Sequence, residues 1–182
     1  MIAVCDYGAG NIASLRSALR RSGLDSFATA DPDRIFEAEH VIFPGVGSAA
    51  SAMRELGRRG IDEALTGRVR RDRPVLGICL GMQLAAEWSE EDGGTRCLGL
   101  VPGRVVGLDC ERVPRIGWAR VEPWGADYYF AHSYGVESDC AVATSEGLTA
   151  ALEHGSFVGV QFHPEKSGVA GEELLRRCLT PA

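Results

Sequence analysis

The chain has 182 residues, which fits one domain with a substantial buried core. With 45% hydrophobic and 24% charged residues its composition is ordinary for a globular protein, and a formal charge of −6 argues against a nucleic-acid partner held by a general positive field. The sequence shows neither the roughly 20 apolar residues of a membrane helix nor a signal peptide, so we expect a cytoplasmic protein without a membrane partner.

The first half of the chain alternates short apolar segments with helical patterns. Buried strands are predicted at 2–6, 26–29, 40–45 and 74–79. The helices expected between and after them are 12–23 with Gly23 as its stop, a short helix capped by Asp31 before Pro32, 48–70 with a break near Gly60, and 80–88. This alternation favours a parallel sheet with helices on both faces.

The second half consists of successive strand candidates with turns between them. They lie at 103–108, 112–123, 127–136, 140–146 and 156–162, and a last helix is expected at 171–179. We expect these strands to form an antiparallel extension packed onto the parallel core. The predicted fold is therefore a single α/β domain over residues 1–182, with a mostly parallel central sheet flanked by helices and an antiparallel extension in the second half.

The cysteine pattern argues against a structural metal and against a disulfide framework. There is no Cys-x-x-Cys pair and no zinc spacing among the six cysteines, which are Cys5, Cys79, Cys97, Cys110, Cys140 and Cys178. We expect reduced thiols, several of them buried as small hydrophobic side chains. No cofactor is implied.

Residues 74–83 read PVLGICLGMQ, which places Cys79 between Gly77 and Gly81 where a strand should become a helix. A nucleophile at such a turn must point its reactive atom out of the sheet, and glycines relieve the crowding of the strained backbone. The unpaired N–H groups at the start of a helix would stabilise a thiolate and an oxyanion forming beside it. The alternative reading is a buried cysteine packed between two glycines.

A thiolate nucleophile needs a base, and His163 is the best placed of the four histidines. It follows a predicted strand, and Glu165 lies two residues further on. Because residues two apart on an extended segment face the same side, Glu165 could reach and orient the imidazole. The alternative is an ordinary histidine at a strand end with a surface glutamate. We expect His40 to be structural and His154 to be exposed.

Together the two motifs supply a nucleophile, a base and an orienting carboxylate in the chain order of the elbow hydrolases. GICLGMQ and GVQFHPEKS resemble the triad type of class I glutamine amidotransferase, which hydrolyses the side-chain amide of glutamine and passes ammonia to a synthase. DYGAGN at 6–11, FPGVGS at 43–48, PRIGW at 114–118 and YFAHSY at 129–134 resemble the glutaminase subunits of imidazole glycerol phosphate synthases, from histidine biosynthesis. The resemblance extends nearly from end to end.

Carried over by position, the resemblance implies three catalytic roles. Cys79 would be the nucleophile, His163 the general base and acid, and Glu165 the residue that orients His163. The residues implied around the substrate L-glutamine are Gly45, Gln83, Glu91, His132, Ser133 and Tyr134. Among them, the carboxylate of Glu91 suits the ammonium group of the substrate.

The resemblance also implies an oxyanion hole. The backbone N–H of Leu80 would supply one donor, and the PGVG loop would supply the other from around Val46 or Gly47. Because a loop with two glycines can turn an amide over, its donor can be absent until the enzyme is engaged. Losing one such donor costs about 10²–10³ in rate, so this loop could act as a switch.

A partner follows from the same resemblance: a (β/α)₈-barrel cyclase subunit, in a heterodimer, that joins the nitrogen to a phosphoribulosyl aminoimidazole carboxamide nucleotide. The residues implied at the docking face are Asn11, Trp118, Tyr129 and Lys166. Aromatic anchors suit a desolvated contact, although core packing is an equal alternative for Tyr129. The sequence departs from the family pattern at Ala119, where asparagine is usual, and at Gly135, where a second tyrosine is common.

Two other functions compete with this reading. One is the glutaminase of another synthase, of the anthranilate or pyridoxal phosphate type, against which PRIGW and DYGAGN argue. The other is an interaction subunit that has kept the fold and lost catalysis. The intact set of Cys79, His163 and Glu165 argues against it.

Overall fold

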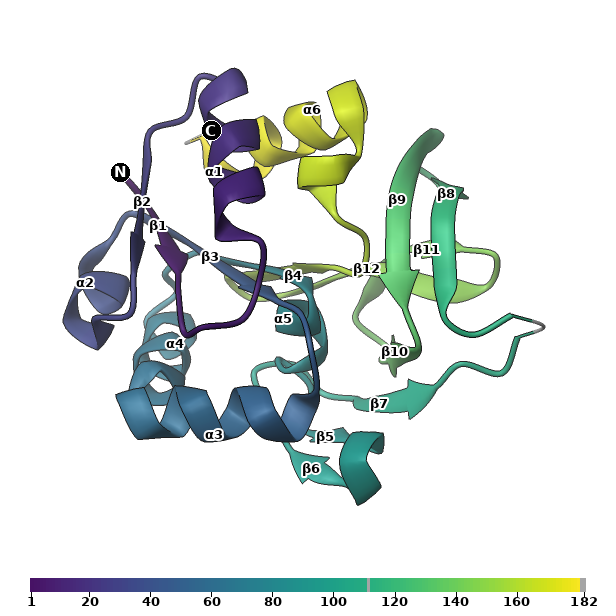
Figure 1. Cartoon of the computed structure of the whole chain (residues 1–182), viewed down its shortest axis with the longest axis horizontal. Helices are drawn as coiled ribbons and strands as arrows, with labels where there is room; N and C mark the ends of the chain where they lie inside the picture. Colours follow the sequence, from purple (N-terminus) through teal and green to yellow (C-terminus); the bar gives the residue numbers. More distant parts are fainter. Residues whose placement is uncertain (111, 181–182) are drawn as a thin grey trace.

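A seven-stranded sheet forms the centre of the molecule and draws on both halves of the chain (Figure 1). The computed structural model describes residues 1–110 and 112–180. Five neighbouring strands run parallel to one another. Two further strands are added at one edge, each pairing antiparallel with the strand on its inner side. In sheet order the strands are β11 (Ala141–Ser145), β12 (Leu148–His154), β13 (Phe157–Val160), β4 (Val75–Cys79), β3 (His40–Gly45), β1 (Ile2–Cys5) and β2 (Ser26–Thr29).

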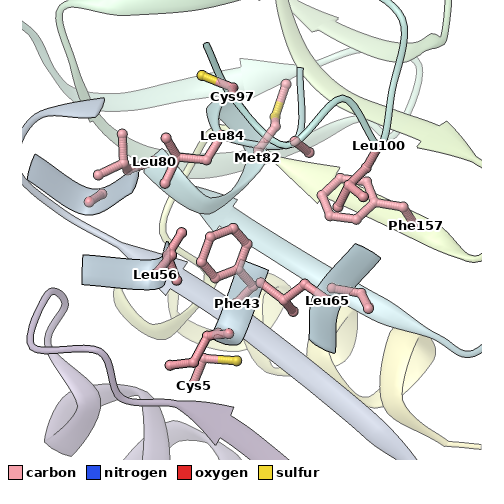
Figure 2. Close-up of a cluster of buried hydrophobic side chains, with 14 of the residues drawn as sticks. Cys5, Phe43, Leu56, Leu65, Leu80, Met82, Leu84, Cys97, Leu100 and Phe157 are labelled. Atoms are coloured by element: carbon pink, nitrogen blue, oxygen red, sulfur yellow. The ribbon is translucent and has the colours of Figure 1, made fainter. Parts of the chain in front are cut away.

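Helices cover both faces of this sheet, which explains why its inner strands are apolar along their whole length. One face packs against α1 (Ile12–Arg21) and α6 (Gly168–Leu179). The other face packs against α2 (Pro32–Glu37), α3 (Ala49–Arg59), α4 (Ile61–Arg70) and α5 (Leu80–Gln83). Figure 2 shows this second core, where Phe43 of β3 lies among leucines contributed by α3, α4 and α5.

Local signals in the first half place most of its elements as predicted. Asp31 caps α2 by accepting hydrogen bonds from the backbone N–H groups of Asp33 and Arg34. The helical stretch after β3 breaks at Gly60, whose φ of +70° favours glycine, and this break separates α3 from α4. Histidines 40 and 154 lie where expected, the first opening β3 and the second exposed at the end of β12.

Two smaller sheets lie beside the main one. The first is four-stranded, in the order β10 (Tyr134–Glu137), β7 (Arg104–Gly107), β5 (Trp88–Ser89) and β6 (Thr95–Arg96). The second is the antiparallel hairpin of β8 (Arg115–Val121) and β9 (Ala126–His132). Two 3₁₀ turns complete the fold, η1 (Glu91–Gly93) and η2 (Pro164–Lys166). Within the described residues, none of the helices has the length and apolar character needed to span a membrane.

The helix predicted at 80–88 is wrong beyond its first turn, because α5 ends at Gln83. The backbone carbonyls of residues 84–87 do not continue the helical ladder. They accept hydrogen bonds from the N–H groups of residues 97–101 instead. The strands β5 and β6, which the sequence did not reveal, follow within this region.

Two strand predictions in the second half also need correction. The strand predicted at 127–136 divides at Ser133, so that β9 and β10 belong to different sheets. The strand predicted at 156–162 is expected in the antiparallel extension, but it pairs antiparallel on one side only. The observed strand β13 lies between β4 and β12, parallel to the first and antiparallel to the second, and so joins the two halves in one sheet.

The glycines on either side of Cys79 are required by close backbone packing. A Cβ atom on Gly77 would lie 2.6 Å from the ring of Phe157. A Cβ atom on Gly81 would collide with the backbone carbonyl of Phe43 on β3. The two glycines therefore let α5 pack directly on the sheet at the point where Cys79 ends β4.

We predict that Gly81→Ala lowers the free energy of unfolding by about 3 kcal/mol or more, because the collision is with rigid backbone. The matched control is Gly57→Ala, at an exposed position of α3 where an added Cβ has ordinary contacts. This control should stabilise the protein by up to about 1 kcal/mol through helix propensity. Denaturant unfolding measures both, and an equal effect of the two substitutions would contradict the packing argument.

Candidate active site

Cys79 occupies a strained turn between β4 and α5. Its backbone has φ +54° and ψ −111°, a conformation that residues other than glycine rarely adopt. The side chain is mostly buried but lines a cavity of about 390 Å³. The turn thus presents the sulfur to a space that a small molecule can enter, as the glycine frame predicts. Since α5 has only four residues, its dipole contributes less to a thiolate than the predicted long helix would.

His163 reaches the same cavity from the end of β13. Its Nδ1 lies 2.9 Å from Oε1 of Glu165, and both side chains are more than nine-tenths buried. The contact was predicted, but the segment is not extended: Pro164–Lys166 forms the 3₁₀ turn η2, in which the Lys166 N–H donates to the His163 carbonyl. The proline begins this turn, and the turn brings the carboxylate back onto the imidazole.

The surroundings of His163 favour its protonated form. Burial alone would lower the pKa of the imidazole, but hydrogen bonds to the Cys79 thiol and the Glu165 carboxylate outweigh it and raise the pKa to about 9. The two ends of the imidazole are thus directed at two acidic partners. Cys79, His163 and Glu165 form a connected set, although 84 residues separate the sulfur from the histidine in the numbering.

Gln161 is a further polar residue at the sulfur, and the sequence analysis missed it. It is fully buried, and its Nε2 lies 3.7 Å from the Cys79 sulfur, within reach of an N–H···S hydrogen bond. Its Oε1 accepts a hydrogen bond of 3.1 Å from Gln83, which also donates to the Tyr134 carbonyl. A signal was present, since Gln161 lies two residues before His163 at the end of the predicted apolar strand 156–162, and alternate residues of an extended segment share a face.

The loop between β3 and α3 runs along one side of the cavity. In the sheet, Gly45 pairs with Cys79, so the loop starts beside the sulfur. Val46 and Gly47 line the cavity, and Gly47 has a φ of +100° that favours glycine. Leu80, whose backbone N–H is the other predicted donor, lines the cavity as well.

The residues predicted to surround the substrate gather at the same cavity. Its lining includes Gln83, Glu91, His132, Ser133 and Tyr134, whereas Gly45 lines a smaller neighbouring cavity behind the loop. Glu91 already has a partner, because its carboxylate accepts a 2.8 Å hydrogen bond from the Ala49 N–H at the start of α3. Burial raises the pKa of Glu91 despite this bond.

His132 is held as a neutral imidazole. Its Nδ1 lies 2.9 Å from the Tyr134 carbonyl oxygen, which fixes the ring. Burial lowers the pKa of His132 to about 4, against the opposing effect of that hydrogen bond. The two histidines that line the cavity therefore differ in charge, and His163 is the cationic one.

Of the four residues predicted for the docking face, three lie in contact with one another, and Asn11 lies at the start of α1 instead. Trp118 of β8 is 58% exposed, and its ring packs edge-on against Tyr129 of β9. The Lys166 ammonium lies 5.6 Å from the Tyr129 ring centre, and Lys166 also lines the cavity. Asn11 caps α1 by accepting from the Ser14 N–H and lines the smaller cavity beside Glu165.

Comparison with known proteins agrees with this geometry. The family model described as glutamine amidotransferase class I matches residues 3–182. The chain belongs to the class I glutamine amidotransferase family. A crystal structure titled glutamine amidotransferase shares its fold, with a TM-score of 0.83 over 98% of this chain and 96% of that one, at 19% identity.

Relatives narrow the placement of this amidotransferase within the family. It is 42% identical to the imidazole glycerol phosphate synthase subunit HisH of Exiguobacterium sibiricum, over 97% of this chain and 93% of the relative. It is 40% identical over its whole length to the chloroplastic imidazole glycerol phosphate synthase hisHF of Arabidopsis thaliana, of which it spans 34%. The amidotransferase therefore groups with the HisH subunits.

The charge state of His163 gives a testable pH dependence. Its pKa of about 9 lies above the ordinary value of 6.5, so the imidazolium is present at neutral pH and is lost as the pH rises through about 9. If it donates the proton to the leaving nitrogen, glutaminase activity falls on the alkaline side near that pH. Glu165→Gln removes a charge that holds the proton, so the alkaline limb should move to lower pH by about 1–3 units.

The pH–rate profile of glutamate release measures this limb. Glu172→Gln is the control, since Glu172 pairs with Arg21 on α1, away from the cavity. An alkaline limb that stays in place in Glu165→Gln, or that moves equally in the control, would show that the carboxylate does not hold the His163 proton.

Proposed function

We propose that the protein is the glutaminase subunit of an imidazole glycerol phosphate synthase, which hydrolyses L-glutamine and delivers ammonia to a cyclase subunit in histidine biosynthesis. The observation that carries the proposal is the 42% identity to a HisH subunit over nearly the full length of both chains. The joined set of Cys79, His163 and Glu165 supplies the chemistry that such a subunit needs.

In the first half-reaction, the Cys79 thiolate attacks the side-chain carbonyl carbon of glutamine. The carbonyl oxygen becomes an oxyanion, and the backbone N–H of Leu80 and one N–H of the Val46–Gly47 loop donate hydrogen bonds to it. The intermediate collapses as its C–N bond breaks and the His163 imidazolium gives its proton to the leaving nitrogen. Ammonia and a Cys79 thioester result, and His163 is left neutral.

In the second half-reaction, neutral His163 removes a proton from a water molecule that attacks the thioester carbonyl. The C–S bond breaks, glutamate leaves, and the thiolate and imidazolium are restored. Glu165 keeps the imidazole in one orientation through both steps and stabilises its cationic form. Gln161 donates to the sulfur and so helps to hold it in position beside His163.

The cavity offers complementary groups for glutamine. Glu91 and Ser133 both line the cavity, which supports binding of the substrate ammonium by the Glu91 carboxylate and of the substrate carboxylate by the backbone around Ser133. Gln83 ties this backbone to the sulfur site by donating to the Tyr134 carbonyl. Substrate binding and the nucleophile therefore share one hydrogen-bonded framework.

Ammonia must leave through a shielded path, because protonation in water would remove its nucleophilic lone pair. We propose that a (β/α)₈-barrel cyclase covers the cavity mouth and receives it, giving a heterodimer whose combined chemistry is that of a hydrolase and a lyase. The exposed side chains of Ile116 and Trp118 on β8, with Tyr129 and Lys166 beside them, form the surface that such a partner would cover.

The two alternatives are weaker. A glutaminase of another synthase would not explain the extended likeness to HisH subunits. A subunit without catalysis would not need a cationic His163 directed at an accessible thiol. We also infer that residues 1–182 fold as one domain, since β13 unites both halves of the chain in one sheet. The six cysteines are free, which fits a reducing cytoplasm.

The direct test is glutamate release by the chain alone and with a cyclase subunit plus its nucleotide. We expect a low rate alone, strong stimulation by the partner, and a loss of about 10⁴-fold or more in Cys79→Ser. Cys140→Ser is the matched control, because Cys140 contacts His154 away from the cavity. Turnover that survives Cys79→Ser would refute the nucleophile assignment. Full activity without the partner would refute the proposal that the Val46–Gly47 loop supplies its oxyanion donor only when the partner is bound.

The partner surface has its own prediction. Trp118→Ala should weaken binding of the cyclase subunit by roughly 30-fold or more, the effect of losing about 2 kcal/mol at an aromatic anchor. Titration calorimetry measures the affinity. Trp88→Ala serves as the control, since Trp88 is 46% exposed but lies on β5 in the other small sheet. Similar affinities for the two variants would place the interface elsewhere.

A further inference from the structure

Tyr7 is a buried residue that the mechanism above does not use. It follows β1 within the stretch DYGAGN, and only 1% of its surface is exposed. Its ring packs against Phe43 of β3, with ring centres 5.8 Å apart. The phenol hydroxyl has no hydrogen-bond partner among the residues that the structure describes. A phenylalanine would fill the same space without burying an unpaired hydroxyl, so the hydroxyl needs an explanation.

The hydroxyl lies against the backbone at Gly45, where the loop with the proposed oxyanion donor at Val46 or Gly47 begins. We refer to this loop as the oxyanion loop. A Cβ atom on Gly45 would be 2.6 Å from the Tyr7 oxygen, so the hydroxyl occupies the space that a side chain at 45 would take. Gly45 pairs with Cys79 across the sheet and immediately precedes Val46, one of the two predicted sources of the second oxyanion donor. Tyr7 lines neither the large cavity nor the smaller one, so its hydroxyl approaches Gly45 from the protein interior.

Peptide geometry connects the two sides of this loop. In a planar trans peptide the N–H and the C=O point in opposite directions. When the Gly45–Val46 peptide turns its N–H toward the oxyanion, the Gly45 carbonyl turns away from the cavity. That carbonyl then needs a donor on the side away from the cavity, and the Tyr7 hydroxyl beside Gly45 is a buried donor without a partner among the described residues. Burial raises the pKa of Tyr7, so its hydroxyl remains protonated and can donate.

We propose that Tyr7 is a positioning residue for the oxyanion hole: its hydroxyl donates a hydrogen bond to the Gly45 carbonyl when the loop presents the Val46 N–H to the reacting amide. The inference rests on the proposed glutaminase function. In the arrangement seen here the bond is not formed, which leaves the hydroxyl unpaired. The cost of that unpaired group is recovered only when the loop turns, so Tyr7 biases the loop toward its catalytic arrangement.

The test is Tyr7→Phe, measured with and without the cyclase subunit and its nucleotide. We expect an unchanged or higher melting temperature and an unchanged KM. The stimulated kcat should fall about tenfold, the effect of one neutral hydrogen bond made only in the engaged state. Tyr128→Phe is the matched control, since Tyr128 is also buried but stacks on Phe162 away from the loop.

A second measurement uses the aldehyde analogue of glutamine, whose adduct with Cys79 carries an oxygen in the oxyanion position. Tyr7→Phe should weaken its inhibition about tenfold while leaving the affinity for glutamine unchanged. Unchanged stimulated kcat and unchanged aldehyde inhibition would overturn the inference. So would a lower melting temperature, because the hydroxyl would then have a partner already. A wild-type protein without glutaminase activity would refute the proposed function instead.

Discussion

The strained turn at Cys79 is the constraint on which the rest of the structure depends. The residue ends β4 in a conformation that costs energy, and it persists because the packing on both sides leaves no alternative. Gly77 lets Phe157 approach one side, and Gly81 lets α5 rest on the carbonyl of Phe43 on the other. The result is a sulfur at the edge of the sheet, facing a cavity, with the oxyanion loop starting at the paired residue Gly45.

The second half of the chain completes the site by fixing the position of His163. Its backbone N–H donates to the Tyr129 carbonyl, and Ser167 links the His163 carbonyl to the Tyr129 N–H through its hydroxyl. Tyr129 lies beneath Lys166 and next to Trp118 on the proposed docking face. The proposed docking face and His163 therefore share one set of backbone hydrogen bonds.

Sequence patterns predicted the parts of this molecule that local rules determine. The strands β1, β3 and β4 are apolar along their length, and the Gly-x-Cys-x-Gly and His-Pro-Glu segments carry their chemistry within a few residues. The predictions failed where distant segments decide. The helix after Cys79 stops because residues 97–101 take its carbonyls, and the strand after 127 divides at Ser133 to supply two sheets.

The residues of the candidate site divide in the same way, between those in local motifs and those whose role depends on contacts with distant segments. The proximity of Cys79, His163 and Glu165 could be predicted from the sequence because each lies in a motif with a known spacing. Gln161 had only its spacing from His163 as a signal, and its contact with the sulfur is a tertiary feature. The Tyr7 hydroxyl could not be assigned, since its importance comes from its contact with Gly45 in space. The contact of Glu91 with Ala49 is likewise a tertiary feature, and it joins the substrate cavity to the end of the oxyanion loop.

The account depends on a Cys79 sulfur whose reactivity is raised by the neighbouring His163 imidazolium. The most direct measurement is the rate of alkylation of Cys79 by iodoacetamide at neutral pH, followed by peptide mass analysis with Cys140 in the same chain as the reference thiol. We predict that Cys79 reacts faster than Cys140 and loses this advantage by about tenfold or more in His163→Ala. A Cys79 that reacts no faster than Cys140, or that is indifferent to the loss of His163, would contradict the account.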